Sequence, residues 1–150
     1  MPQSLAKIYV HIVFSTKLRE SWLTEKIQPE LYAYMAGILK TWESPGIQIG
    51  GMPDHVHILS MLSKNHAACK VVEEVKKGSS KWIKTKGAEF KNFSWQNGYG
   101  IFSISPSHVD KVKTYIENQK EHHRRTIFMD EFRKLLKKYD IPYDERYVWD

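Results

Sequence analysis

Hydrophobic and polar residues alternate along residues 5–16, near the start of the chain. Successive side chains of a β-strand point to opposite faces, so this alternation predicts a strand with distinct faces. One face carries Ile8, Val10, Ile12 and Phe14, and the other carries Tyr9, His11, Val13 and Ser15. The first face is expected to lie in the core, and the second places a histidine beside any neighbouring strand.

The same reading extends through the next five elements. Apolar residues at helical spacing predict helices, and short apolar runs bounded by turn residues predict strands. The predicted elements are a helix at 24–42, strands at 47–52 and 55–62, a helix at 66–84 that is bent near 78–80, and a strand at 93–104. This βαββαβ order predicts an α+β fold of the ferredoxin-like or RRM-like type. The first and third strands should be central, with helices on one face and the other face free.

A late helix follows the predicted sheet. Ser105, Pro106 and Ser107 are good start signals for a helix that we expect at 107–123. Its apolar stripe, formed by Val109, Val112 and Ile116, should seat it on the protein. A short helix at 129–139 and an aromatic tail complete residues 129–150, and we expect residues 1–150 to form one domain.

Two histidines open the third predicted strand, in the sequence His55-Val56-His57. Side chains two residues apart in a strand share a face and lie about 7 Å apart, so both imidazoles can bind one metal ion. Val56 then points into the core. The alternative is that each histidine is an ordinary core or surface residue. His11 can lie beside the pair, either as a structural residue or as a contact in the site.

Tyr115 and Gln119 are four residues apart on the late helix and therefore share a face. Beside a histidine pair, a phenol and an amide suggest a nucleophile and a third metal ligand. The alternative is that Tyr115 only packs at the edge of an amphipathic helix. The other seven tyrosines lie in segments whose pattern indicates packing, or lack a suitable partner four residues away.

Together these motifs resemble a known family, the HUH-type single-tyrosine transposases of insertion sequences, which includes the REP-associated tyrosine transposases. The matching residues are His55-Val56-His57, the Tyr115-Ile116-Glu117-Asn118-Gln119 segment and the stretch 9–17. The resemblance implies that Tyr115 attacks a phosphate of single-stranded DNA with hairpin ends, leaving a 5′-phosphotyrosine and a 3′-OH. It also implies Mg²⁺ or Mn²⁺ as the metal, and a homodimer in which the tyrosine helix of one subunit completes the histidine pair of the other.

This chemistry is consistent with the residues themselves. A phenol is only about 0.1% ionised at neutral pH, so Tyr115 needs help as a nucleophile. A cation held by His55, His57 and Gln119 would keep its full charge for the phosphate, because all three ligands are neutral. The 3′-OH can reverse the cleavage without ATP, which favours cutting and rejoining over hydrolysis.

Composition and charge limit the classes of binding partner and the cellular location that we expect. A net charge of +6 and a pI near 9.3 favour a polyanionic partner. Cys69 is the only cysteine, which excludes an internal disulfide or a thiolate metal cluster. No apolar run is long enough to cross a membrane and no secretory signal is visible, so we expect a cytoplasmic protein.

Cations gather on the second helix and after the tyrosine helix. The candidates for DNA binding are Lys76, Lys77, Lys81, Lys84, Arg124 and Arg125. Glycine and serine at 78–80 would allow close approach of a phosphate, and Trp82 could stack on a base. The alternative is a solvated helix face.

Two other functions remain open from the sequence. One is a non-catalytic, RRM-like nucleic-acid-binding protein, although His55 and His57 stand where stacking aromatic residues would be expected. The other is a metal-dependent phosphoesterase that uses water, with Tyr115 incidental. A covalent protein–DNA adduct distinguishes these functions, because only the transposase requires one.

Overall fold

Four antiparallel strands form the centre of the molecule. The computed structural model describes residues 2–150. The strands are β1 (Tyr9–Ser15), β2 (Gly46–Met52), β3 (His55–Met61) and β4 (Gly100–Ile104), and their order in the sheet is β2-β3-β1-β4. The helices α1 (Gln28–Thr41) and α2 (Ala68–Lys84) connect them in the order βαββαβ. The predicted ferredoxin-like fold is confirmed, with β1 and β3 as central neighbours.

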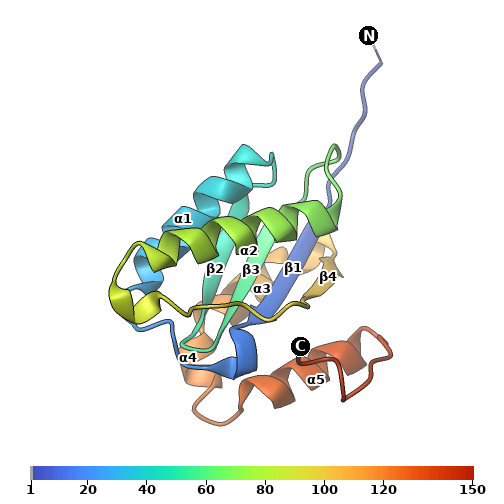
Figure 1. Cartoon of the computed structure of the whole chain (residues 1–150). Helices are drawn as coiled ribbons and strands as arrows, with labels where there is room; N and C mark the ends of the chain where they lie inside the picture. Colours follow the sequence, from blue (N-terminus) through green and yellow to red (C-terminus); the bar gives the residue numbers. More distant parts are fainter. Residues whose placement is uncertain (1) are drawn as a thin grey trace.

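The first face of the sheet is the main core. Val10, Ile12 and Phe14 of β1 point to this face and are almost completely buried, as the alternating pattern predicted. Ile8 was predicted on the same face, but it precedes β1 and is 40% exposed. They pack together with Val56 and Ile58 of β3 against the apolar sides of α1 and α2. Figure 1 shows these two helices lying side by side across the sheet. Burial of each large side chain contributes about 1.5–3 kcal/mol, so this layer is a main source of stability.

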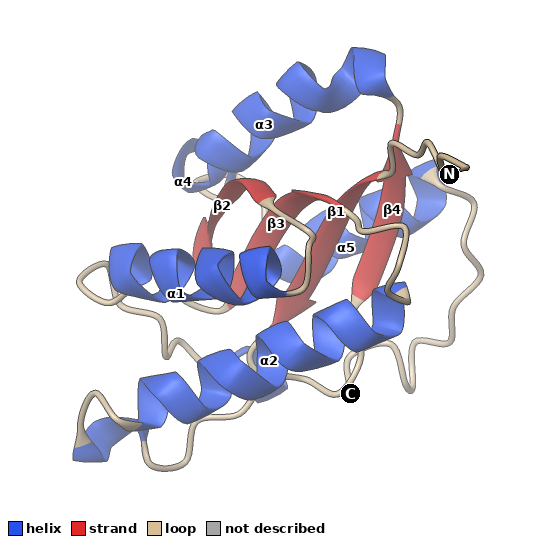
Figure 2. Cartoon of the chain, turned by 90° about the horizontal axis from the view of Figure 1, so that it is seen from above, coloured by secondary structure: helices blue, strands red, loops and turns tan. Residues whose placement is uncertain are grey.

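The second face is covered rather than free, which corrects the expectation from the sequence. Three further helices, α3 (Val109–Glu117), α4 (Gln119–His122) and α5 (Phe128–Lys138), follow β4 in the chain. Figure 2 shows α3 on the side of the sheet opposite α1 and α2. Ile116 of α3 packs on Leu59 and Ile104, while α5 packs on Val13 and Phe102. The residues after the sheet therefore supply the cover that a second subunit was expected to give.

Helix α2 runs without interruption through residues 78–80, where a bend was predicted. Ser79 keeps its hydroxyl inside the helix by donating to the carbonyl of Val75 at 2.6 Å. Gly78 serves a contact between helices, because a Cβ there would lie 2.7 Å from Cδ1 of Ile38 in α1. The glycine and serines therefore allow close helix packing instead of breaking the helix.

The fourth strand is shorter than predicted, because residues 93–99 form a loop before β4 begins at Gly100. Phe93 and Trp95 leave the sheet to pack in the main core, and a single bridge joins Trp95 to Thr16. The side chain of Gln96 accepts a hydrogen bond from the amide of Ser15 at 2.8 Å, which ties the loop to the end of β1. Within residues 2–150, none of the helices has the length and apolarity needed to cross a bilayer.

Candidate active site

The histidine pair of β3 lies on the second face of the sheet. His55 and His57 are fully buried, and their ring centroids are 5.1 Å apart. Val56 between them points to the main core on the opposite face. The shared face of the two imidazoles is therefore as the strand pattern predicted.

Each of these imidazoles has an outer partner on Nδ1. The Nδ1–H of His55 donates to Oδ1 of Asp54 at 2.7 Å, and Nδ1 of His57 lies 2.8 Å from Nε2 of His11. Thr16 fixes the turn that carries Asp54, because its amide donates to the Asp54 carbonyl at 2.9 Å. Both histidines thus direct Nε2 toward the centre of the site, and His11 belongs to the site as a partner of His57.

Tyr115 and Gln119 approach the same centre from α3 and α4. The ring of Tyr115 lies 5.8 Å from that of His57, and Oε1 of Gln119 lies 3.1 Å from Nε2 of His55. The predicted single helix is divided at Asn118, but both side chains still face the histidines. Within this one chain, the tyrosine helix lies over its own histidine pair.

The backbone of α3 comes close to the sheet at one position. A Cβ on Gly50 would lie 2.8 Å from the carbonyl oxygen of Ile116, so only glycine allows this contact between β2 and α3. Ile116 is 1% exposed and adjoins Tyr115 in sequence. The position of the tyrosine therefore depends on Gly50 as well as on the apolar stripe of α3.

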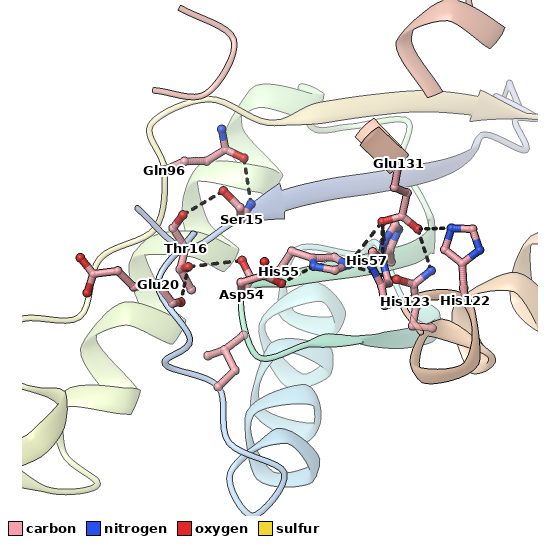
Figure 3. A network of polar contacts seen from close by, with 12 residues as sticks. Ser15, Thr16, Glu20, Asp54, His55, His57, Gln96, His122, His123 and Glu131 are labelled. Atoms are coloured by element: carbon pink, nitrogen blue, oxygen red, sulfur yellow. Dashed lines mark hydrogen bonds and ion pairs between the residues drawn. The ribbon is translucent and has the colours of Figure 1, made fainter. Parts of the chain in front are cut away.

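Glu131 of α5 lies at the centre of the site, although it was not among the residues predicted from the sequence. Figure 3 shows its carboxylate among the imidazoles, on the side facing β3. Oε1 lies 3.0 Å from Nε2 of His57, 3.0 Å from Nε2 of His123 and 3.4 Å from Nε2 of His55. Oε2 accepts hydrogen bonds from the Tyr115 hydroxyl and from Nε2 of Gln119. Only 2% of Glu131 is exposed.

A signal for Glu131 was present in the sequence. Phe128, Phe132 and Leu136 form the apolar stripe of α5, and Glu131 falls on that stripe. An acid at a core-facing position indicates a polar partner inside the protein. Gly100 allows α5 to approach this closely, because a Cβ there would lie 2.7 Å from Cε1 of Phe132.

The electrostatics of the site follow from these contacts. Burial alone raises the pKa of Glu131, but hydrogen bonds from His123, His55 and His57 outweigh it and hold the pKa well below its usual value. Burial lowers the pKa of His55, yet Asp54 and Glu131 together raise it to about 9. Burial and the charge of Glu131 raise the pKa of the Tyr115 phenol. The metal-free site therefore holds a carboxylate, a protonated His55 and a neutral phenol.

The arrangement fits a divalent cation. His55, His57, His123 and Glu131 offer three ring nitrogens and a carboxylate oxygen, all within 4.8 Å of one another. Ligands with bonds of about 2.1 Å lie about 3.0–3.4 Å apart in octahedral or tetrahedral geometry, and the contacts of Oε1 fall in this range. His55 has acceptors near both ring nitrogens, so its second proton occupies a place that a cation can take.

This ligand set differs from the predicted one. Gln119 was expected as the third ligand, and it lies at the edge of the cluster beside His55. His123 and Glu131 are additional candidates, and Glu131 brings a negative charge to a site that was expected to have only neutral ligands. A cation held here would keep less positive charge for a phosphate than one held by three neutral ligands.

The predicted DNA-binding lysines of α2 lie away from this cluster, whereas the two predicted arginines adjoin it in the chain. Lys77, Lys81 and Lys84 are exposed on α2, across the sheet from α3, the helix that carries Tyr115 (Figure 2). Lys76 faces inward, where its ammonium donates to the carbonyls of Asn97 and Gly98, and burial lowers its pKa to about 8. Arg124 and Arg125 are exposed directly after α4, on the side of the site. Lys76 therefore has a structural role of its own.

Comparison with known proteins shows which family this chain belongs to. The family model described as "Transposase IS200 like" matches residues 4–119 of the chain. The chain belongs to this transposase family. A transposase acts on DNA, so the buried cluster around Tyr115 is its candidate active site. The match ends at Gln119, so His123 and Glu131 lie beyond the residues that the family model covers.

Two solved structures are similar to this transposase in fold. One is a candidate transposase from Deinococcus radiodurans R1, with a TM-score of 0.62 and 22% identity, covering 79% of this chain and 98% of that chain. The other is a REP-associated tyrosine transposase bound to a REP hairpin, with a TM-score of 0.61 and 16% identity, covering 82% of this chain and 73% of that chain. No curated protein sequence matches significantly.

Proposed function

We propose that this transposase cuts and rejoins single-stranded DNA with Tyr115 as its covalent nucleophile. One observation carries the proposal: the Tyr115 hydroxyl meets a buried cluster of three histidines and a glutamate that fits a divalent cation. A phenol beside such a cluster is placed for attack on a phosphate bound there. The family assignment supports a DNA strand as the substrate.

The residues of the site would have two roles, binding the cation and orienting the residues that bind it. His55, His57, His123 and Glu131 would hold the cation, with Gln119 beside them, while Asp54 and His11 orient the two strand histidines. When bound, the cation would neutralise negative charge on a phosphate oxygen. Because imidazole ligands outnumber carboxylates here, the site favours Mn²⁺ over Mg²⁺, the two metals that the family resemblance implies.

The chemical step is the transfer of a DNA phosphoryl group to the hydroxyl oxygen of Tyr115. Its oxygen forms a bond to phosphorus while the bond from phosphorus to the 3′-oxygen breaks, giving a 5′-phosphotyrosine and a 3′-OH. The phenolic proton is lost to solvent and a proton is gained by the 3′-oxygen. Attack by a 3′-OH on the phosphotyrosine reverses the step and rejoins a strand without an external energy source.

The substrate is single-stranded DNA with hairpin ends. The related structure with a bound REP hairpin supports a hairpin, and the net charge of +6 supports a polyanion. The exposed cations Lys77, Lys81, Lys84, Arg124 and Arg125 would contact phosphates. The family resemblance implies a homodimer, and the sequence leads us to expect a cytoplasmic protein. Nucleic-acid binding alone, on an open RRM-like sheet, is disfavoured because α3, α4 and α5 cover that face.

A trapped adduct tests this function. Incubation with 3′-end-labelled single-stranded DNA and Mn²⁺ should give a denaturation-resistant adduct on the peptide that contains Tyr115. Tyr115→Phe should lose the adduct and retain DNA binding, whereas Tyr99→Phe and Tyr143→Phe should keep it. An adduct on Tyr99 or Tyr143 would overturn the assignment of Tyr115.

A phosphoesterase that uses water is the second candidate. The carboxylate in the cluster favours it, since histidines with a glutamate are also the ligands of hydrolytic metal sites. This function predicts metal-dependent cleavage in Tyr115→Phe and no covalent adduct in the unmodified protein.

A further inference from the structure

Helices α3 and α5 enclose a cleft of about 800 Å³ beside the candidate active site. Its inner end reaches Tyr115, Glu131 and His11, and its floor includes Ile104 at the end of β4. Six of its fourteen lining residues come after Gln119 and lie outside the part of the chain that the family model covers. A cleft of this volume lies within the range of small-molecule sites, so it can accept a nucleotide but is too small for a duplex.

The rim of the cleft is positively charged. Lys111 of α3 and Lys134 and Lys138 of α5 line it, and all three are exposed. None of them is among the ion pairs of residues 2–150, in contrast to Lys70, Lys86 and Lys120. Glu131, at the inner end, is the one acid in the described lining, and its oxygens are occupied by Tyr115 and the imidazoles. The ammonium of Lys138 lies over the Tyr139 ring, 5.7 Å from its centroid, and none of the three ammonium groups is neutralised by a carboxylate, so the rim offers positive charge to an anion.

The interior of the cleft is apolar and partly aromatic. Val112 of α3 and Leu135 of α5 line it, together with Tyr139 at the end of α5. The Tyr139 ring is stacked on Phe102 at 4.7 Å between centroids, which holds the ring in a fixed orientation. A fixed aromatic ring with apolar neighbours is a suitable surface for a nucleic-acid base.

We propose that this cleft binds the nucleotide that adjoins the scissile phosphate, with its base against Tyr139 and Leu135 and its outer phosphate at Lys134 and Lys138. The inference rests on the proposed function, because the cleft leads from the nucleophile to the surface. A strand whose phosphate lies at Tyr115 must continue outward, and this cleft combines cations with an apolar surface along that path. The lysines of α2 cannot serve this nucleotide, since the sheet separates α2 from α3, which carries Tyr115 (Figure 2).

Thymidine 3′,5′-bisphosphate is a suitable probe, because it carries one base and a phosphate on each side. Its affinity for the full-length protein would be measured by calorimetry without added metal, together with that of inorganic phosphate. Lys134→Ala and Lys138→Ala should each weaken binding of the bisphosphate about tenfold, since each removes a charged hydrogen bond. Lys137→Ala, an exposed lysine of the same helix outside the cleft, is the matched control and should leave the affinity unchanged.

The outcomes distinguish the proposed nucleotide-binding cleft from the proposed nucleophilic role of Tyr115. Binding that depends on Lys134 and Lys138 supports the cleft even in Tyr115→Phe, where covalent cleavage is absent. A Tyr115 adduct that forms equally well on a 15-residue oligothymidylate in the wild type, Lys134→Ala and Lys138→Ala would overturn the cleft and leave the proposed function intact. The proposal also fails if Lys137→Ala weakens the bisphosphate as much as the cleft variants do, or if inorganic phosphate binds as tightly as the bisphosphate.

Discussion

The hydroxyl of Tyr115 donates a hydrogen bond to Oε2 of Glu131, sixteen residues later in the chain. The contact joins the candidate nucleophile of α3 to the only acid of the buried cluster in the described chain. Because Glu131 also contacts His57 and His123 through Oε1, the phenol and the candidate metal ligands form one connected network. Helix α5 is thus part of the site rather than an appendage to the sheet.

Replacing Glu131 should change both the metal site and the phenol. Glu131→Gln removes the one charged ligand, so we expect Mn²⁺ affinity, measured by calorimetry, to fall at least tenfold. The same change should lower the pKa of Tyr115, because the charge of Glu131 raises it. Ultraviolet titration against the Glu131→Gln/Tyr115→Phe double variant isolates this phenol. Glu117→Gln, at an exposed position of α3, should alter neither quantity.

Asp54, the hydrogen-bond partner of His55 Nδ1, should affect metal affinity almost as strongly as a metal ligand does. Asp54→Asn keeps the shape of the turn but removes the carboxylate that accepts from Nδ1 at 2.7 Å. Loss of such partners lowers metal affinity about 10- to 100-fold, which we expect here for Mn²⁺. Asp110→Asn, at an exposed position of α3, is the control. Unchanged affinity in Asp54→Asn would show that His55 does not bind the metal.

The contact at Gly50 predicts a selective loss of cleavage. In Gly50→Ala the new methyl group must displace α3, because it would lie 2.8 Å from the Ile116 carbonyl oxygen. A displacement of about 1 Å at a nucleophile can reduce its rate about 100-fold, so the yield of Tyr115 adduct should fall by that order while DNA binding persists. Gly37→Ala in α1, where no atom lies within 4 Å of the new Cβ, should add about 0.5–1 kcal/mol of stability and leave the adduct yield unchanged.

The raised pKa of His55 predicts that the metal-free protein loses stability in mild alkali. The folded-state pKa is about 9, against an ordinary value of 6.5. Protonation of His55 therefore stabilises the fold fully below about pH 6.5, and this contribution disappears as the pH rises through 9. Denaturant unfolding in EDTA should show a decline of up to roughly 3 kcal/mol between pH 7 and 10. Asp54→Asn should reduce the decline, and a flat profile in the wild type would contradict the assignment.

The single chain brings Tyr115 to its own His57, with the two rings 5.8 Å apart. Mixing Tyr115→Phe subunits with His57→Ala subunits should therefore leave cleavage absent, because no intact site forms in either chain. The measurement is adduct yield after subunit exchange has been verified with differently labelled chains. Restored activity would instead show the arrangement shared between subunits that the family resemblance implies.

Local sequence patterns determined on which face of its strand or helix each of the predicted site residues lies. The alternation in residues 9–15 and the spacing of His55 and His57 follow from the two-residue period of a strand, which is a property of the backbone alone. The helical spacing of Tyr115 and Gln119 follows in the same way, so both pairs were placed on the correct faces. These features need no knowledge of what packs against them.

The tertiary structure alone decided what lies opposite those faces. His57 and Glu131 are 74 residues apart, and their contact depends on α5 packing against β4 at Gly100. Lys76 similarly turns inward because the carbonyls of a distant loop accept its hydrogen bonds. Periodicity reports which side of an element is buried, but not its neighbour across the core. The histidine pair and the tyrosine could therefore be predicted from the sequence, whereas the glutamate that joins them could not.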